Sequence, residues 1–564
     1  MAAAGDRVVT SQDRTLCGLC RPERLLDLIR RFTVFDGGIR KVARHQQVFA
    51  VRRAMDTVKQ QDMNGGGRQG GVIWHTQGSG KSLTMVMLGR SLTLAPGMEN
   101  PRMIIVTDRD GLDKQTKATF KSCDLEPVRA TSGTHLLKLI CDKTPLITTI
   151  INKFDTALRK SQVIDDDRNI FVLVDESHRS QTGRYGGHSR MAGKMRRMLP
   201  NACYLGFTGT PLLKLERNTL SSFGRLIHHY TINEAVADQA VVPLLYEGRL
   251  VQQQVTGEGI DRWFDKISVG LTDNQKADLK RKFSRMDALA KTDQAIRAKA
   301  FDISEHYRQH WQCTGFKAQL VAPSKAAAVR FKQVLDHLGH VSSAIIISPP
   351  NNPEDNEEVD QDSKDLVDNF WSKMMKQYKH EEDYNREIIE AFQGSGDPGI
   401  LIVVSKLLTG FDAPRNTVLY ICKLLKEHNL LQAIARVNRL HEDGNAKQEK
   451  QFGFILDYEG LLGEPDRALT TYSAFGNYDP ADLQGTVHDI REEIRRLPQL
   501  HEQLWDLFKP VRNKRDMEQL EQHLGDDSIR EAFYERLRAF SRCLHICLSS
   551  DNFWTSSTRN KLMQ

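Results

Sequence analysis

A glycine-rich turn that carries a lysine and a hydroxyl residue is the strongest chemical signal in this 564-residue sequence. Residues 71–82, GVIWHTQGSGKS, pass from an apolar stretch into this turn, and a helix-like stretch follows. Glycines let backbone N–H groups approach phosphate oxygens, and a helix N-terminus adds partial positive charge. Lys81 is expected to reach the β and γ phosphates of a nucleotide, and Ser82 to ligate Mg²⁺. The predicted nucleotide contacts in this loop are His75, Thr76, Gln77, Gly78, Ser79, Gly80, Lys81 and Ser82.

The match to G-x-x-x-x-G-K-[ST] is imperfect, because His75 replaces the first glycine. A chance glycine-rich turn is therefore the alternative interpretation of this segment. The apolar stretch before the turn and the helical stretch after it favour the phosphate loop.

A second signal is a pair of carboxylates at the end of a predicted strand, in residues 171–178, FVLVDESH. Asp175 is expected to hold Mg²⁺ through water, and Glu176 to orient and deprotonate an attacking water. His178 could couple the acids to a neighbouring domain. The alternatives are a solvated strand end for the acids and an ordinary surface histidine for His178.

A third signal is a glutamine and two arginines near residue 435. Gln432, Arg436 and Arg439 are spaced i, i+4 and i+7, which predicts one face of a helix. The planar guanidinium suits a phosphate, so both arginines are candidate arginine fingers, with Arg439 favoured over Arg436. Upstream, Gly410 gives backbone freedom for a close approach to a ligand, and Asp412 is expected to organise an interdomain cleft. A solvated basic helix and an ordinary strand–turn are the alternatives.

Short apolar runs alternate with helical stretches, which predicts an α/β fold with parallel sheets buried on both faces. Residues 273–310 are interpreted as connecting helices and residues 349–362 as an acidic loop, and no strand is expected after residue 480. The expected parts are a lead-in (1–40), two α/β domains (41–240 and 241–475) and a helical C-terminal segment (476–564). The predicted strands are residues 72–74, 103–106, 146–151, 171–174 and 204–207, then 318–321, 344–347, 400–404, 418–421 and 452–456.

Composition sets broad limits on the class of protein. A net charge of +7 permits a polyanionic partner without demonstrating one. With 40% hydrophobic residues the chain can fill more than one core. No apolar run is long enough for a transmembrane span, and the first residues do not resemble a secretory signal. The nine cysteines, scattered through the chain, suit a reducing cytoplasm.

The sequence resembles a superfamily-two nucleic-acid motor, in particular the motor portion of the R subunit of type I restriction enzymes. HTQGSGKS, DESHRSQTG and QAIARVNR match that family's phosphate loop, motif II and motif VI, and LLTGFDAP matches motif V. The resemblance covers most of residues 20–475 and implies two RecA-like domains. It places Gln46 at the adenine-reading position.

The same resemblance implies DNA-contact and coupling residues. VTDRDGLDKQ resembles motif Ia, ITTIINKFD the next DNA-contact element, and FTGTPL motif III, which links nucleotide state to DNA grip. The residues implied are Asp108 and Arg109, Asn152 and Lys153, and Thr208, Gly209 and Thr210.

The resemblance implies an ATP- and Mg²⁺-dependent translocase on double-stranded DNA, partnered by modification and specificity subunits of a type I restriction complex. The family's N-terminal nuclease is not expected in this sequence, so a separate nuclease is a further candidate partner. Glu449–Lys450 is interpreted as a polar loop rather than a nuclease metal site. Two alternatives stay open: a strand-separating helicase, and a non-enzymatic remnant that binds DNA or partner subunits.

Two cysteine pairs invite comparison with a zinc site. Cys17 and Cys20 lie near one end of the sequence, and Cys543 and Cys547, with His545 between them, lie near the other. Such spacings occur often by chance, so ordinary buried or free thiols are preferred to zinc.

Overall fold

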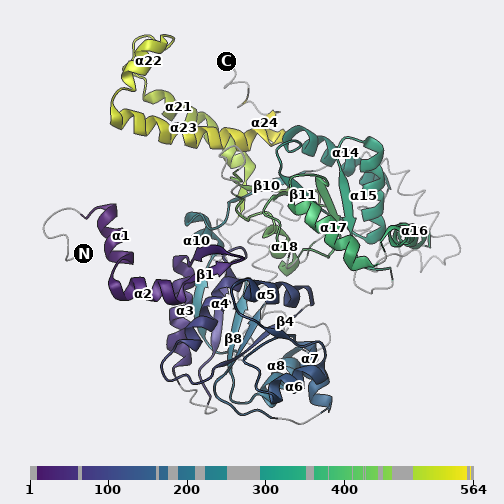
Figure 1. Ribbon diagram of the computed structural model, residues 1–564. Helices are drawn as coiled ribbons and strands as arrows, with labels where there is room; N and C mark the ends of the chain where they lie inside the picture. The colour runs from purple at the N-terminus through teal and green to yellow at the C-terminus, as the bar shows by residue number, and fades with distance from the viewer. Residues whose placement is uncertain are drawn as a thin grey trace, which may run out of the picture. The chain divides into compact units, whose positions relative to one another are not determined.

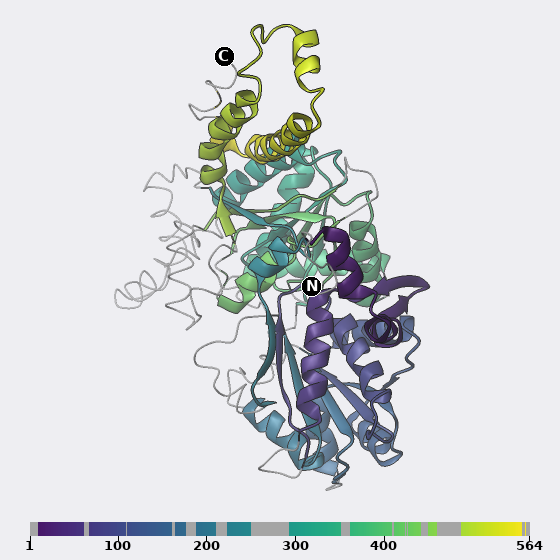
Figure 2. The same ribbon diagram turned by 90° about the vertical axis from the view of Figure 1, so that its left-hand side faces the viewer.

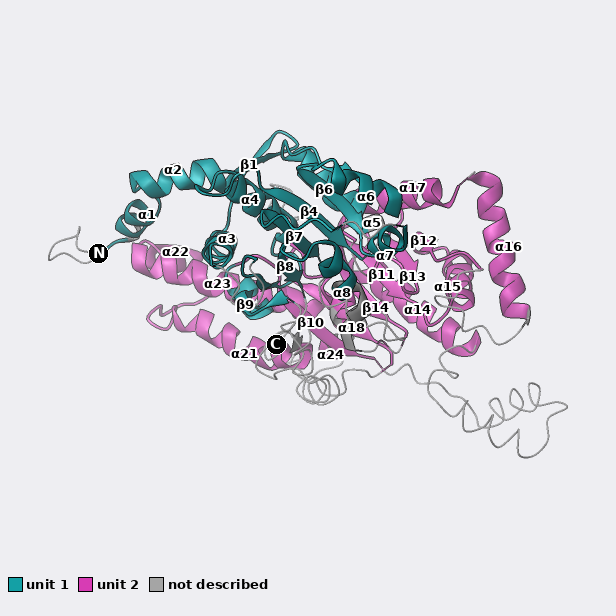
Figure 3. Ribbon diagram, turned by 90° about the horizontal axis from the view of Figure 1, so that it is seen from below, with its two compact units in different colours: residues 1–238, 476–482 teal, residues 239–475, 483–564 magenta. Residues whose placement is uncertain are grey.

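The computed structural model describes residues 9–60, 67–108, 110–160, 164–175, 188–209, 223–249, 293–350, 361–378, 380–408, 411–423, 425, 427–441, 449–459, 487–554 and 559. The chain forms two compact units, which Figure 3 shows in different colours. Unit 1 comprises residues 1–238 and 476–482, and unit 2 comprises residues 239–475 and 483–564. Each unit is built on its own sheet.

Unit 1 contains a seven-stranded sheet in the order β5-β6-β4-β7-β8-β3-β9, and every strand pair in it is parallel. Its strands are β3 (Gly71–His75), β4 (Arg102–Thr107), β5 (Val128–Arg129), β6 (Leu146–Ile150), β7 (Ile170–Asp175), β8 (Cys203–Thr208) and β9 (Leu226–Tyr230). A separate antiparallel hairpin joins β1 (Thr33–Asp36) to β2 (Ile39–Val42).

Helices cover both faces of the unit 1 sheet (Figure 1). Alternate strand residues face opposite sides: Ile73 packs with α3 and α4, whereas Val72 belongs to the core cluster beneath α6, α7 and α8. This two-sided burial explains the continuous apolar runs of the sequence. The helices are α1 (Ser11–Leu19), α2 (Pro22–Arg31), α3 (His45–Val58), α4 (Lys81–Thr93), α5 (Asp110–Ser122), α6 (Gly133–Cys141), α7 (Asn152–Lys160), α8 (His188–Met198) and α10 (Ile232–Ala237).

Unit 2 contains a second seven-stranded parallel sheet, in the order β12-β13-β11-β14-β15-β10-β16. Its strands are β10 (Leu244–Gly248), β11 (Lys317–Val321), β12 (Ser343–Ile346), β13 (Ile400–Val403), β14 (Asn416–Ile421), β15 (Gly453–Asp457) and β16 (Val487–Asp489). Its helices are α14 (Asp293–His310), α15 (Lys325–Leu338), α16 (Gln361–Gln377), α17 (Glu381–Gln393), α18 (Glu427–Ile434), α21 (Ile490–Asp506), α22 (Met517–His523), α23 (Asp527–Leu548) and α24 (Asp551–Trp554).

The C-terminal segment is helical, as the sequence predicts, but it also contributes a strand. Helices α21 and α23 pack side by side with α22 at their far end (Figures 1 and 2). The expectation that no strand follows residue 480 is wrong, because β16 pairs with β10 at the edge of the sheet. Three residues of mixed polarity, Val487, His488 and Asp489, give no apolar run to detect.

All ten predicted strands are present. Four further strands of the two large sheets, β5, β9, β10 and β16, and the β1–β2 hairpin are not among the predictions. Within residues 273–310 the structure describes helix α14, and residues 273–292 lie outside the described part of the chain. No helix among the described residues combines the length and the apolar character needed to cross a lipid bilayer.

Candidate nucleotide and nucleic-acid site

Three of the predicted motifs meet at one edge of the unit 1 sheet. Strand β8 lies between β7 and β3, and the parallel register pairs Trp74 with Thr208 and Phe207 with Asp175. The carboxyl ends of these three strands are therefore neighbours. In open α/β sheets, ligands bind in the crevice outside the carboxyl ends of the strands.

The phosphate loop has the backbone geometry that its glycines predict. Gly78 and Gly80 have φ angles of 83° and 89°, in the left-handed region that favours glycine. Helix α4 begins at Lys81, and its N-cap, Gly80, has no side chain that could cap the first turn. The Ser79 hydroxyl donates to the Thr76 carbonyl at 2.6 Å, which closes the turn. A helix N-terminus in this setting is suited to bind an anion.

The amine of Lys81 lies between the phosphate loop and motif III. Its Nζ donates to the His75 carbonyl at 3.3 Å. A Cβ added at Gly209, directly after β8, would lie 2.7 Å from this Nζ and 2.6 Å from Cγ of Gln77. The structure thus brings Gly209, Gln77 and Lys81 together. Thr208, the last residue of β8, is fully buried, and Thr210 lies outside the described residues.

Two predicted metal ligands approach the same edge of the sheet. Asp175 is the half-buried last residue of β7, and Ser82 is half-buried in the first turn of α4. Carboxylate and hydroxyl oxygens are hard donors that suit Mg²⁺. The other two predicted residues of motif II, Glu176 and His178, lie outside the described residues.

The side chain and the backbone carbonyl of His75 have different partners: the ring bonds His228 in the protein interior, and the carbonyl accepts from Lys81. The ring is fully buried, and its Nε2 lies 3.0 Å from Nδ1 of His228 on β9. Burial lowers the pKa of His75 to about 3, with a smaller contribution from His228, and burial also lowers the pKa of His228 to about 4. Both rings are therefore neutral at pH 7.

Two adjacent glutamines at the start of α3 differ in their contacts. Gln46 is buried, and neither of its amide atoms has a hydrogen-bond partner within the described part of the chain. Gln47 accepts from the Arg44 backbone N–H at 2.9 Å and donates from Nε2 to the Gly80 carbonyl at 3.1 Å. Gln47 is thus a phosphate-loop contact that is absent from the predicted site residues, although it directly follows the predicted Gln46.

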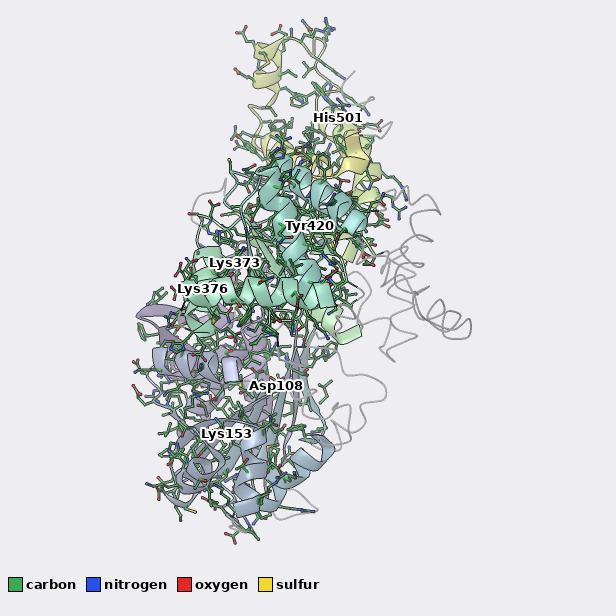
Figure 4. The ribbon with its side chains drawn as sticks, turned by 90° about the vertical axis from the view of Figure 1, so that its right-hand side faces the viewer. Asp108, Lys153, Lys373, Lys376, Tyr420 and His501 are labelled. Atoms are coloured by element: carbon green, nitrogen blue, oxygen red, sulfur yellow. The ribbon has the colours of Figure 1, made fainter. Side chains whose placement is uncertain are left out.

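The predicted DNA-contact residues follow β4 and β6 at the same edge of the sheet. Asp108 directly follows β4 and is half-buried, and Asn152 and Lys153 begin α7 after β6. Asn152 is exposed, whereas the Lys153 amine donates to the Ala130 carbonyl. Figure 4 labels Asp108 and Lys153 on unit 1. Arg109 lies outside the described residues.

In unit 2, motif VI is not the continuous helix that its spacing predicts. Helix α18 contains Gln432, which is buried, but it ends at Ile434. Tighter i→i−3 bonds follow, from the Arg436 N–H to the Ala433 carbonyl and from the Val437 N–H to the Ile434 carbonyl. The three predicted residues therefore do not share one helix face, and the prediction of that face is wrong.

The two motif VI arginines have different environments. Arg436 is 4% exposed and donates to the backbone carbonyls of Gln432 and Phe411, the latter in motif V. The side chain of Arg439 is 20% exposed and forms an ion pair with Asp412, whose side chain is 45% exposed. The Gln393 amide donates to the Asp412 carbonyl at 2.6 Å. Gly410 lies outside the described residues.

Lys450, predicted to lie in a polar loop, is buried beside motif V. Its amine donates to the Pro414 carbonyl at 3.2 Å and to the Asn416 carbonyl at 2.6 Å. Burial, and next the charge of Arg439, hold the pKa of this amine well below its usual range. Lys450 therefore fixes the chain after motif V to the segment that leads into β15.

The cysteine pairs have ordinary protein environments. Cys543 donates to the Glu493 carbonyl at 3.2 Å, and Cys547 is buried in the core of α21 and α23. Within the ranges that the structure describes, no three His, Cys, Asp or Glu side chains form a group that could hold a metal. All nine cysteines are free thiols.

Two family models match successive parts of the chain, the first of them extending past the end of unit 1. Residues 46–277 match the SWI2/SNF2 ATPase model, and residues 314–460 match the model of type I restriction enzyme subunit R domain 3.

The curated relatives are restriction enzyme subunits. The chain is 31% identical over 520 residues to a candidate type I restriction enzyme endonuclease subunit, MjaIXP, from Methanocaldococcus jannaschii; this covers 90% of this chain and 46% of the relative. It is 32% identical over 510 residues to the type I restriction enzyme HindI endonuclease subunit from Haemophilus influenzae, covering 85% of this chain and 46% of the relative. The chain thus spans about half the length of these relatives.

Among solved structures, a fragment of an HsdR subunit of a type I restriction enzyme from Vibrio vulnificus YJ016 aligns with 16% identity and a TM-score of 0.48, over 86% of this chain and 75% of that chain. The family assignment rests on the sequence matches. By these matches, the chain combines a SWI2/SNF2 ATPase domain (residues 46–277) with domain 3 of the type I restriction enzyme R subunits (residues 314–460).

Proposed function

We propose that this chain is an ATP- and Mg²⁺-dependent motor that translocates along double-stranded DNA as part of a type I restriction system in the cytoplasm. The observation that carries the proposal is the close approach of the Lys81 amine to Gly209, at the N-terminus of α4 and beside the strand that ends in Asp175. It joins a cation, a helix terminus and a carboxylate at one strand edge, which is what binding a metal-complexed triphosphate requires.

Each residue has a proposed role in turnover. Backbone N–H groups of Gln77, Gly78 and residues 80–82 would bind the phosphates, Lys81 would stabilise the β and γ phosphates, and Ser82 and Asp175 would hold Mg²⁺. Glu176 would activate the attacking water. Gln46 and Gln47 are both candidates for reading adenine, since Gln46 is unpartnered within the described residues and Gln47 already contacts the loop.

Of the two motif VI arginines, we propose Arg439 as the finger that acts on the transferred phosphoryl group. Its guanidinium is held by one half-exposed carboxylate, that of Asp412, which a phosphate could replace. The guanidinium of Arg436 is buried against two backbone carbonyls and is proposed to hold motif V.

DNA contact, mainly to backbone phosphates, is proposed for the motif Ia and α7 residues, Asp108, Arg109, Asn152 and Lys153. The residues proposed to couple nucleotide state to DNA grip are His178, Thr208, Gly209 and Thr210. Site choice would then come from specificity and modification subunits as partners. DNA cleavage, which the relatives' designation as endonuclease subunits names, is not part of the proposal, and a separate nuclease is a further candidate partner.

The deciding experiment compares the ATPase rate with and without linear duplex DNA for the parent chain, Lys81→Ala and Glu176→Gln. We expect stimulation by duplex DNA in the parent and loss of turnover in both variants. Full activity of Lys81→Ala would reject the assignment, and a parent without ATPase activity would favour a binding remnant.

The mode of movement needs a second pair of assays. Displacement of a third strand from a triplex, without opening of a forked duplex, is expected for a translocase. Efficient opening of the fork would instead identify a strand-separating helicase.

A further inference from the structure

The last strand of unit 1 is joined to the first residues of the phosphate loop by side-chain and backbone contacts. The Thr76 N–H donates to the Tyr230 carbonyl at 2.9 Å, which continues the β3–β9 pairing one residue into the loop. The His75 and His228 rings are bonded at 3.0 Å, and the Tyr230 ring lies edge-on to His75 at 5.8 Å. Strand β9 is therefore held to the start of the loop by both backbone and side-chain contacts.

The direction of the hydrogen bond between the two histidines follows from their surroundings. With both rings neutral, one nitrogen donates and the other accepts. Nδ1 of His75 has no partner among the described residues, and a buried acceptor without a partner costs less than a buried donor without one. His75 therefore donates from Nε2 to Nδ1 of His228.

From β9 the contacts continue to the residue at which the chain leaves unit 1. The Tyr230 hydroxyl donates to the Asp238 carboxylate at 3.0 Å. Between them, α10 is closed by a capping box in which Thr231 and Glu234 bond each other's backbone N–H groups. Asp238 is the last residue of unit 1 before residue 239 begins unit 2.

A second set of contacts returns from Asp238 to the far end of the phosphate loop. Nε2 of His45, the first residue of α3, lies 3.2 Å from the Asp238 carboxylate. Two residues later Gln47 bonds the Gly80 carbonyl, and a Cβ at Gly80 would lie 2.7 Å from this amide. The segment that ends unit 1 thus bonds the start of the loop directly and is connected to its far end through His45 and Gln47 of α3.

We propose that His75 and His228 are positioning residues of a relay, through Tyr230, Asp238 and His45, that transmits the state of the phosphate loop to the segment leading into unit 2. The relay rests on the proposed function, since its input is a bound nucleotide. His75 then contributes to coupling rather than to nucleotide recognition: its ring is buried, and only its carbonyl meets Lys81.

The test uses the full chain and three variants. His228→Phe keeps the ring and removes the hydrogen bond, whereas His228→Asn keeps a polar atom near the position of Nδ1. His229→Phe is the matched control at the next residue, whose side chain is 53% exposed. The readouts are the dissociation constant of an ATP analogue, the stimulation of ATPase by duplex DNA, and hydrogen exchange in residues 226–238 with and without Mg²⁺ and a non-hydrolysable ATP analogue.

We expect His228→Phe to bind the analogue within about twofold of the parent and to lose DNA stimulation by about tenfold, with His228→Asn and His229→Phe near the parent. In the parent, the analogue should slow exchange in residues 226–238 as well as in α4, and His228→Phe should keep only the effect in α4. A mere structural role would instead lower analogue affinity in step with stimulation.

The relay is overturned if His228→Phe retains DNA stimulation within twofold, or if the analogue leaves exchange in residues 226–238 unchanged while protecting α4. If the parent chain binds the analogue but its ATPase is not stimulated by DNA, the proposed function alone is contradicted. Hydrogen exchange in residues 226–238 then tests whether the relay exists. A chain that binds no analogue contradicts both.

Discussion

Gly209 illustrates how a single hydrogen atom in place of a side chain sets the geometry of the site. The two groups that an added Cβ would meet, Nζ of Lys81 and Cγ of Gln77, belong to flexible side chains, so they can yield without unfolding the sheet. A side chain at position 209 would therefore displace the Lys81 amine, and glycine avoids this displacement. Its substitution should act on chemistry more than on folding.

The Gly209→Ala variant is expected to remain folded and to lose about 100-fold in ATPase kcat, because a displacement near 1 Å of a reacting group has about this effect. Steady-state ATPase assays measure the loss of kcat, and thermal unfolding shows whether the variant remains folded. The matched control is Gly193→Ala in α8, where a Cβ would meet nothing within 4 Å. Gly209→Ala activity within twofold of the parent would contradict the contact.

Substitution of each motif VI arginine by alanine should have a different effect, one on catalysis and the other on stability. Arg439→Ala is expected to lower single-turnover ATP hydrolysis by about 1,000-fold, the lower end of the range for arginine fingers, with little loss of stability. Arg436→Ala is expected to destabilise unit 2 by about 1–3 kcal/mol, because the carbonyls of Gln432 and Phe411 lose a buried donor. Denaturant unfolding and single-turnover rates distinguish them, and the reverse pattern would assign the finger to Arg436.

Single residues could be predicted from the sequence where the expected ligand requires a particular residue type. Residues whose role depends on contacts with distant parts of the chain could not. The loop glycines, Lys81 and Asp175 follow from the chemistry of phosphate and Mg²⁺. No local sequence pattern reveals contacts between residues that are far apart in the chain. The hydrogen-bond partner lies 33 positions from Gln47, 153 positions from His228 and 34 positions from Lys450.

Strands β3 and β9 together make unit 1 sensitive to acid. The pKa values of His75 and His228, about 3 and about 4 in the folded protein, lie below the usual 6.5. The unfolded chain therefore binds more protons between pH 6.5 and these values, so folding stability falls as the pH falls. Each group adds a slope of at most about 1.4 kcal/mol per pH unit.

The stability of unit 1 should therefore decrease between pH 6.5 and pH 4 more steeply in the parent than in His228→Asn, which lacks one of the two titrating rings. Urea unfolding at several pH values, followed by an activity-independent probe such as far-UV circular dichroism, measures the slopes. Equal slopes would show that the buried pair does not contribute.

Most of the predicted strands are buried on both faces, but β10 is missed although Leu244 and Leu245 belong to the two different core clusters of unit 2. Strands such as β4 and β7 are apolar throughout because helices cover both faces of the sheet. Strand β9, LIHHY, contains two histidines, and β5 has only two residues, so neither shows an apolar run. Helix α18 ends at Ile434, and the Gln432 carbonyl accepts from the Arg436 side chain where a longer helix would have it accept from the Arg436 N–H.

The molecule as a whole consists of two units, each with its own sheet and core. The phosphate loop belongs entirely to unit 1. If the units unfold separately, Mg²⁺ and a non-hydrolysable ATP analogue should raise the unfolding temperature of one transition only, by an amount that corresponds to about 2.7 kcal/mol at 100 times the dissociation constant. Differential scanning calorimetry with and without the analogue tests this expectation.

Lys81→Ala supplies the control for that experiment, since it removes a proposed phosphate contact while leaving α4 in place. Both transitions of this variant should be much less sensitive to the analogue. A shift of the unit 2 transition in the parent, with none in unit 1, would contradict the placement of the nucleotide.

The position of β10 in its sheet has a consequence for biosynthesis. This strand is the first described strand of unit 2 to be made, yet its partners among the described residues are β15 and β16, and β15 begins about 200 residues later. At ribosomal rates of about 5–20 residues per second, the nascent strand waits about 10–40 seconds with both edges unpaired. Its apolar residues Leu244, Leu245 and Tyr246 would be available to chaperones, or to neighbouring nascent chains, during that interval.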